Sequence, residues 1–203
     1  RLRDRRLPAR DRAGRCGSCC VLLRPAIASQ GEAHPASRGA ERLSRQVLLD
    51  FALGAGWTKV GTLQWLSRGK SLDDKWAVHF IGEERWLHRM QFADVLGTGQ
   101  PQLVISPLNA TQGDGVRLTA FSIPKNPQTE SWPRTLLDSE LSRMHNHWHA
   151  DLNQDGSLDT ITASQEGVFL IERDGRRFRK TKIGTGQPGT TPTTSGAGGV
   201  KVG

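Results

Sequence analysis

A nine-residue stretch from Asp151 to Asp159 carries the clearest chemistry in this sequence. Oxygen-bearing side chains fall at its first, third, fifth and ninth positions, and a glycine at the sixth position allows a sharp turn. Ca²⁺ in proteins is held by about six to eight oxygen atoms. The spacing therefore predicts a calcium loop. Its ligands are the side chains of Asp151, Asn153, Asp155 and Asp159 and, at the seventh position, the backbone carbonyl of Ser157.

The surroundings of this stretch exclude an EF-hand. An EF-hand places a bidentate Glu at the twelfth position and a helix on each side of the loop, but the twelfth residue is Thr162. Residues 145–152 and 160–164 are short runs of the kind that form strands. We therefore expect a loop between two strands, in which the ion locks the turn. The alternative is a turn without metal, which would leave three carboxylates repelling one another.

Histidines form the second chemical cluster. His145, His147 and His149 alternate along one expected strand, which places their side chains on one face. His88 occupies the position of His145 in an earlier stretch of similar sequence, so the two side chains could converge. Imidazoles in such a place either act as a base or hold a transition metal such as Zn²⁺. The alternative is that they pack as neutral, hydrogen-bonded side chains.

These residues belong to an internal repeat. Residues 87–95 align with residues 144–152 at an offset of 57, with His, Ala and Asp coinciding, and the glycines of the following turns also align. Each unit continues with three further expected strands. Four short antiparallel strands per unit, at a period of about 50 residues, are typical of a β-propeller blade. The sequence thus predicts an all-β fold of four-stranded antiparallel blades.

The blades occupy residues 46–203. Residues 60–81 are expected to supply only the outer two strands of one blade, 88–137 and 145–183 two full blades, and 196–203 the start of the next. A propeller protects its sheet edges by closing a ring of about four to eight blades. We therefore expect a partial β-propeller, whose missing blades and further domains belong to a longer parent chain.

The net charge of +8 is located in one segment. Residues 1–45 carry a net charge of +7 and no aromatic residue, which predicts a disordered basic tail, and the remainder carries +1. No nucleic-acid partner is therefore expected, and no apolar run is long enough to span a membrane. The three cysteines, Cys16, Cys19 and Cys20, lie in this tail. Half of a metal or redox site is the alternative reading of their spacing.

Residues 151–164 resemble the FG-GAP or VCBS repeat, a calcium-loop blade of propellers that include integrin α-subunits, and rings of this repeat commonly have seven blades. A longer pattern over residues 60–203 resembles the propeller of aldos-2-ulose dehydratase-like proteins, which are carbohydrate lyases and isomerases. The segments that carry this second resemblance are His88-Arg89 before 93–95, residues 104–108, His145-Asn146, residues 163–168 and residues 196–203.

The resemblance implies two functions. The first is a lyase in which a base removes the proton α to the carbonyl of an anhydro-ketose or aldos-2-ulose sugar, and water is eliminated. His88 and His145 are its candidate catalytic residues, and Arg89 its candidate for steadying the enolate oxygen. The second is a non-catalytic extracellular platform that binds glycan or protein partners. Either would be extracellular or periplasmic, although no clear signal peptide is recognised.

The repeat contains a second loop of different composition. In residues 94–102 only Asp94 keeps a carboxylate, while Leu96 and Gln102 stand at two ligand positions. We therefore expect a turn of the same shape that holds no ion tightly.

Overall fold

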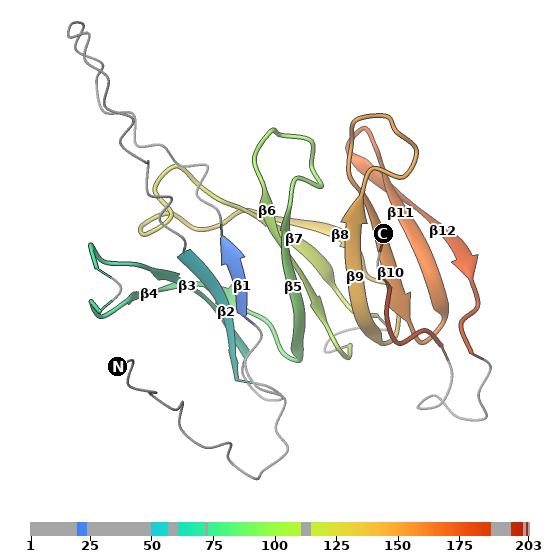
Figure 1. Ribbon diagram of the computed structural model, residues 1–203. Coiled ribbons are helices and arrows are strands. Elements are labelled where there is room, and N and C mark those ends of the chain that lie inside the picture. Colours follow the sequence, from blue (N-terminus) through green and yellow to red (C-terminus); the bar gives the residue numbers. More distant parts are fainter. Residues whose placement is uncertain are drawn as a thin grey trace, which may run out of the picture.

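The computed structural model describes residues 20–23, 50–56, 61–71, 73–110, 115–187, 196–200 and 202. Within these residues the chain forms twelve β-strands and no helix. The strands build three four-stranded antiparallel sheets that stand side by side (Figure 1). This architecture confirms the all-β prediction and is that of a β-propeller fragment. No helix in the described part has the length and apolar composition needed to cross a membrane.

The second and third sheets span the two stretches expected to form full repeat units. Each runs in sequence order from its first to its fourth strand, as expected for hairpin-connected blades. The second sheet comprises β5 (Leu87–Ala93), β6 (Gln102–Pro107), β7 (Leu118–Ser122) and β8 (Arg134–Asp138). The third comprises β9 (Met144–Ala150), β10 (Asp159–Ser164), β11 (Gly167–Asp174) and β12 (Arg177–Gly184).

The first sheet corrects two sequence predictions. It comprises β1 (Cys20–Leu23), β2 (Asp50–Gly56), β3 (Gly61–Ser67) and β4 (Ala77–Glu83). This sheet is therefore not limited to the two outer strands expected from residues 60–81. Nor is the whole of residues 1–45 a disordered tail, because β1 pairs with β2 along its length. The pairing joins segments 26 residues apart, which no local pattern reveals. The rest of that tail, with Cys16 and Cys19, lies outside the described residues.

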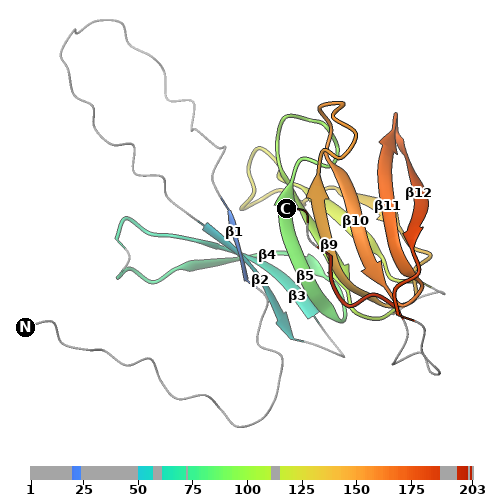
Figure 2. The ribbon, with the colours of Figure 1, turned by 45° about the vertical axis from the view of Figure 1, so that its right-hand side comes forward.

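The three sheets are arranged with their first strands together. β1 contacts β5 and β5 contacts β9, whereas β8 meets β12 on the opposite side. Figures 1 and 2 both show this stacking of neighbouring sheets. In a propeller the first strands line the central channel, so β5 and β9 place their residues where the channel of a closed ring would lie.

Two apolar cores hold the sheets together, because alternate residues of each strand face a neighbouring sheet. The core between the first and second sheets includes Leu63, Trp65, Leu103, Ile105 and Phe121. The core between the second and third sheets includes Val104, Val116, Leu118, Met144 and Ile171. The second sheet is thus buried on both faces, and the histidine strand β9 is fixed against it.

The end of the described chain lies against the third sheet. The backbone N–H of Ala197 donates to the carbonyl of Ser164, and the side chain of Asn146 donates to the carbonyl of Val200. The described residues of 196–203 form no strand beyond an isolated bridge at Gly196. That this segment opens a further blade stays a prediction.

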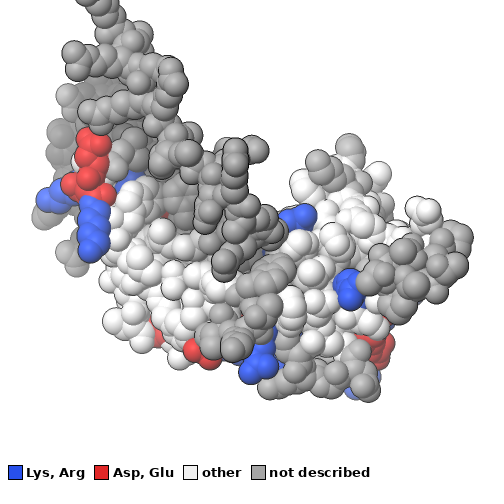
Figure 3. Space-filling model, turned by 90° about the horizontal axis from the view of Figure 1, so that it is seen from below, with Lys and Arg blue, Asp and Glu red and all other residues white. Residues whose placement is uncertain are grey.

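Charged side chains are scattered over the described surface. On the face seen in Figure 3, some lysines and arginines lie beside acidic residues at the left, and the others are scattered singly among uncharged residues. This agrees with the near-neutral balance of the sequence after residue 45.

Candidate functional site

His88 and His145 are the extra residues of two equivalent β-bulges. Between β5 and β6 the pairing passes from Leu87 to Arg89, and between β9 and β10 it passes from Met144 to Asn146. A bulged residue leaves the regular alternation, which is how bulges re-aim side chains near functional sites. The internal repeat aligns the two histidines, but no local pattern in the sequence indicates the bulges.

The two bulged imidazoles meet across the first strands of neighbouring sheets. Their ring centroids lie 5.2 Å apart with an interplanar angle of 80°, an edge-to-face contact. His145 is exposed, whereas His88 is only 9% exposed. Burial, followed by the charge of Arg89 and the neighbouring His145, lowers the pKa of His88 to about 4. The ring of His88 is therefore neutral at physiological pH, the form that accepts a proton or binds a metal.

His147 and His149 form a separate, inner pair. Their ring centroids are 5.1 Å apart. Nδ1 of His147 lies 2.9 Å from Oγ of Ser106 on β6, and Nδ1 of His149 lies 2.9 Å from Oγ1 of Thr160. Nε2 of each ring is buried with no hydrogen-bond partner among the described residues. Because His145 is bulged, the expected row of three histidines on one face is divided into an outer ring and this inner pair.

The inner pair is held neutral by its surroundings. Burial, then the proximity of His149 and of Arg89, lowers the pKa of His147 well below its usual value. Burial lowers the pKa of His149 to about 4. The reading of these two rings as neutral packing groups between sheets thus accounts for their geometry. Arg89 lies on β5 beside both pairs, opposite Ser106 in the strand pairing.

The 151–159 loop is a tight turn organised by Asp151. Oδ1 of Asp151 accepts the backbone N–H of Asp155 at 3.1 Å, and Oδ2 accepts that of Gly156 at 2.9 Å. Gln154 and Gly156 have positive φ values of 61° and 85°, which close the turn. Asn153 and Asp155 are joined by a side-chain hydrogen bond of 3.0 Å. Of the five predicted ligands, Asp151 thus uses both oxygens to close the turn, and the other four line a common depression.

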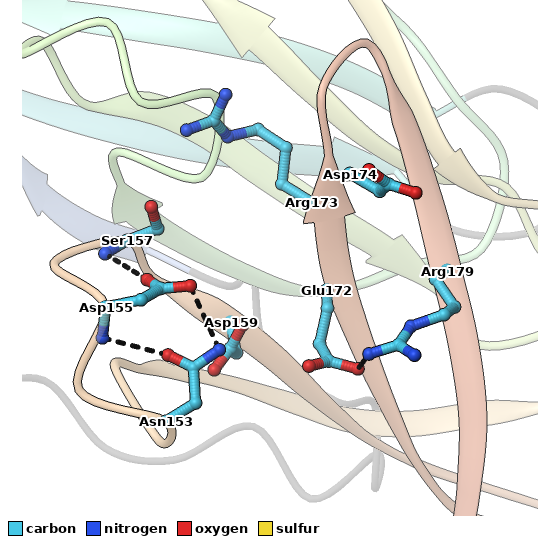
Figure 4. A pocket seen from close by; sticks show the side chains of 8 residues that line it. All are labelled: Asn153, Asp155, Ser157, Asp159, Glu172, Arg173, Asp174 and Arg179. Carbon is cyan, nitrogen blue, oxygen red and sulfur yellow. Dashed lines mark hydrogen bonds and ion pairs between the residues drawn. The ribbon is translucent and has the colours of Figure 1, made fainter.

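These side chains line an open depression of about 360 Å³ (Figure 4). Four of its residues belong to the 151–159 loop and four to the hairpin formed by β11 and β12. Together they place several carboxylates and two guanidinium groups around one space. The lining residues are Asn153, Asp155, Ser157, Asp159, Glu172, Arg173, Asp174 and Arg179.

Negative charge accumulates around Asp159 in this depression. It is only 3% exposed. Burial raises its pKa, and the neighbouring carboxylates of Glu172, Asp155 and Asp151 raise it further against the effect of one hydrogen bond from the Leu152 N–H. No three His, Cys, Asp or Glu side chains in the described residues approach closely enough to form a ready metal site. The loop thus holds the donors that Ca²⁺ prefers without a finished shell around one point.

The 94–102 loop has the same backbone turn as the 151–159 loop but a different side chain at its centre. Oδ1 and Oδ2 of Asp94 accept the N–H groups of Thr98 and Gly99 at 2.9 and 2.6 Å, in the pattern that Asp151 makes. The two positive-φ residues of the turn are Gly97 and Gly99, at 63° and 75°. The turn is thus reproduced at an offset of 57 residues.

Gln102 fills the centre of the 94–102 loop with an amide. Its Nε2 donates to Oδ1 of Asp94 at 3.2 Å, to Oγ1 of Thr98 at 2.9 Å and to the carbonyl of Gln100. Its Oε1 accepts the N–H of Leu96 at 3.0 Å. Burial alone would raise the pKa of Asp94, but the hydrogen bonds from Thr98, Gln102 and Gly99 hold it below its usual value.

The three oxygens that this amide bonds stand at the first, fifth and seventh positions, where the 151–159 loop has Asp151, Asp155 and Ser157. At the ninth position that loop has Asp159, an acceptor, instead of the donor Gln102. The residues of the 151–159 loop therefore fit a cation. In the 94–102 loop the amide N–H group of Gln102 bonds the three oxygens, whereas the 151–159 loop has a further carboxylate, Asp159, at that position.

Comparison with known proteins gives a family and a relative. Residues 60–203 match the family model described as the β-propeller domain of aldos-2-ulose dehydratase. The aldos-2-ulose dehydratase of Phanerodontia chrysosporium is 26% identical over 139 residues. This match covers 65% of the chain and 15% of the length of that relative.

Proposed function

Because the chain belongs to the family of aldos-2-ulose dehydratase β-propeller domains, we propose that it is part of a carbohydrate lyase acting on anhydro-ketose or aldos-2-ulose sugars. The match to a named dehydratase supports this substrate class. We propose in addition that its sheets are FG-GAP or VCBS blades of a seven-bladed ring. The remaining blades and further domains would come from the parent chain, in an extracellular or periplasmic setting.

The observation that carries the proposed activity is the meeting of His88 and His145 at two equivalent bulges, 5.2 Å apart. Loss of water from a keto sugar begins with removal of the proton on the carbon α to the carbonyl. The hydroxyl group on the next carbon then takes up a proton and departs as water. We assign the proton transfer to the exposed His145 and the neutral His88. Arg89, beside His88 in the chain, is assigned to the enolate oxygen.

A metal at these imidazoles is the second way to stabilise the enolate. His88 and His145 are two neutral-capable nitrogen ligands of the kind that Zn²⁺ prefers. A bound Zn²⁺ would polarise the sugar carbonyl as a Lewis acid. The chain's own contribution would be unchanged: it orients two imidazoles toward one place and keeps His88 free of a proton.

We propose that the 151–159 loop binds one Ca²⁺ through Asp151, Asn153, Asp155, Ser157 and Asp159. The ion would lock the turn between β9 and β10. Since β9 carries the histidines, this would fix the candidate site without taking part in the reaction. The support is the comparison with Gln102, whose amide bonds the equivalent positions.

The experiment is a dehydration assay of the full-length parent protein on an anhydro-ketose. His145→Ala and His88→Gln should each reduce kcat by about a hundredfold or more, as for a lost acid–base group. His88→Gln replaces the ring with a polar side chain, because His88 is buried and truncation to Ala would also remove packing. His79→Gln in the first sheet, where the ring pairs with Ser67, is the control and should retain activity.

Full activity of both histidine variants would exclude this mechanism. It would favour the alternative function, a non-catalytic platform that binds glycan or protein partners. Loss of activity in proportion to a loss of folded protein, measured by thermal unfolding, would instead identify the two imidazoles as packing groups.

A further inference from the structure

The two strands that carry the bulged histidines belong to different sheets. β5 is the first strand of the second sheet and β9 is the first strand of the third, so no strand pairing joins them. Among the described residues, no hydrogen bond holds the exposed ring of His145, and its ring contact is with His88 across the two sheets. The meeting of the two rings therefore depends on how the second and third sheets are placed relative to each other.

A hydrogen bond connects these first strands close to the ring contact. Nε2 of Gln91 on β5 donates to the backbone carbonyl of His147 on β9 at 2.8 Å. Since β9 is the edge strand of its sheet, one side of its backbone is open to such a donor. His147 follows His145 by two residues, so the bond lies about 7 Å along the strand from the ring contact.

His147 also bonds the second sheet through its ring. Its Nδ1 lies 2.9 Å from Oγ of Ser106, which pairs with Arg89, the residue after His88. His147 is fully buried, so both bonds are shielded from water. Hydrogen bonds require a defined direction and distance, whereas apolar burial is non-directional. The two bonds therefore fix the position of β9 on the second sheet more closely than the apolar core does.

The amide of Gln91 is specific to this interface. At the offset of 57 residues that relates the two repeat units, the equivalent residue is Trp148, which has no amide. A side chain that only filled the space between sheets would need no donor. The amide thus occurs where two bulged histidines of neighbouring sheets meet, and it bonds the strand that carries one of them.

We propose that Gln91 is a positioning residue of the candidate site, whose bond to the His147 carbonyl holds β9 where His145 reaches His88. The inference rests on the catalytic role proposed above for the two imidazoles. Gln91 acts through the placement of β9 and transfers no proton itself. A displacement of about 1 Å in a catalytic group can reduce the rate about a hundredfold, so a small shift of β9 is sufficient.

The first measurement detects the ring contact without any assay of activity. In NMR spectra of the 203-residue chain with labelled histidines, the rings of His88 and His145 should show a nuclear Overhauser effect. Gln91→Met keeps the length of the side chain and removes the donor, so this cross-peak should be lost. Gln64→Met is the matched control, because Gln64 is also half-buried and donates to Thr62 within the first sheet. It should keep the cross-peak.

A second variant and a rate measurement complete the test. Gln91→Glu keeps the shape of the side chain but replaces the donor by an acceptor, so it should also lose the cross-peak. In the full-length parent protein, Gln91→Met should lower kcat for dehydration about tenfold to a hundredfold. KM should change little, because no group assigned to the sugar is removed. Gln64→Met should leave both constants unchanged.

The outcomes separate this inference from the proposed function. If both Gln91 variants keep the cross-peak, Gln91 does not position His145 and only the present inference fails. If the cross-peak is lost while the parent variant keeps its kcat, the meeting of the imidazoles is not needed and the proposed function fails. Loss of the cross-peak and of kcat in protein that unfolds thermally like the control supports the inference. Loss of both only in proportion to unfolded protein would overturn it.

Discussion

The second and third sheets share one backbone plan and differ in a few side chains. Both have the same strand order, the same bulged histidine and the same positive-φ turn. At four equivalent positions the second sheet carries an apolar or non-ionisable residue and the third an ionisable one. These pairs are Met90 and His147, Phe92 and His149, Gln102 and Asp159, and Ser122 and Glu172.

The difference teaches that a repeat can keep its backbone fold while one copy acquires additional ionisable side chains at equivalent positions. In the second sheet Gln102 bonds the polar groups of its loop with both ends of its amide, and the buried ionisable side chain is His88. The third sheet adds three further ionisable side chains, His147, His149 and Asp159, whose pKa values are shifted mainly by burial. Exchanging residues between the two sheets, or changing the pH or the Ca²⁺ concentration, tests this difference.

The largest expected effect is acid destabilisation through the inner histidine pair. His147 and His149 have folded-state pKa values below the ordinary 6.5, so the unfolded chain binds more protons. The contribution of each is therefore complete above about pH 6.5 and is lost as the pH falls through its lowered folded-state pKa, which is about 4 for His149. From pH 7 to pH 5, His149 alone should cost about 2 kcal/mol of unfolding free energy, and His147 should add to this.

The exchange His147→Met with His149→Phe introduces the residues of the second sheet. It should reduce the pH dependence of urea unfolding between pH 7 and pH 5 and leave the part that is due to His88, whose pKa is also lowered to about 4. Equal slopes in the exchanged and unmodified proteins would mean that other groups cause the acid response.

The next largest effect concerns the Ca²⁺ affinity of the 151–159 loop and the residue at its ninth position. Asp159→Gln introduces the residue of the 94–102 loop, whose amide can bond the oxygens of Asp151 and Asp155. We expect Ca²⁺ affinity to fall at least about a hundredfold, or about 2.7 kcal/mol, in calorimetry. Without Ca²⁺, the variant should be more stable than the unmodified protein, because a buried charge is removed. Asp73→Asn, at an exposed site in another loop, is the control; equal affinity of Asp159→Gln and this control would contradict the loop comparison.

Removing the amide of Gln102 should destabilise the protein whether or not calcium is present. The side chain is 1% exposed and bonds Asp94, Leu96, Thr98 and Gln100. Gln102→Ala leaves several of these groups unsatisfied, which should cost about 2 kcal/mol in denaturant unfolding. Gln100→Ala changes an exposed side chain of the same loop and should be close to neutral. Rescue of Gln102→Ala by millimolar Ca²⁺ would show that this loop also binds the ion.

The smallest effect distinguishes the two turns at their fourth position. Gln154 has a φ of 61°, where the second sheet has Gly97. Gln154→Gly should relieve backbone strain and stabilise the protein by about 0.5 kcal/mol. The reverse change, Gly97→Gln, should destabilise it, since Gly97 has a φ of 63°, a conformation that residues with a side chain rarely adopt. Both are measured by thermal unfolding, and a destabilising Gln154→Gly would show that its side chain makes a compensating contact.

Local patterns in the sequence predicted most of the described fold. The all-β antiparallel architecture was confirmed, because alternation and turn glycines act over a few residues. The first sheet was predicted only in its outer half, since β1 and β2 are separated by 26 residues. The catalytic and calcium roles of the candidate residues stay predictions.

The sequence by itself determined the repeat, the strand periodicity and the spacing of Asp151, Asn153, Asp155 and Asp159, because these depend on neighbours along the chain. Only the tertiary structure decided that His88 and His145 leave the alternation and meet, and that Glu172 faces the acidic loop. Those relations arise from strand register and from the stacking of sheets. Both are set by contacts between residues far apart in the chain, whose partners no local pattern specifies.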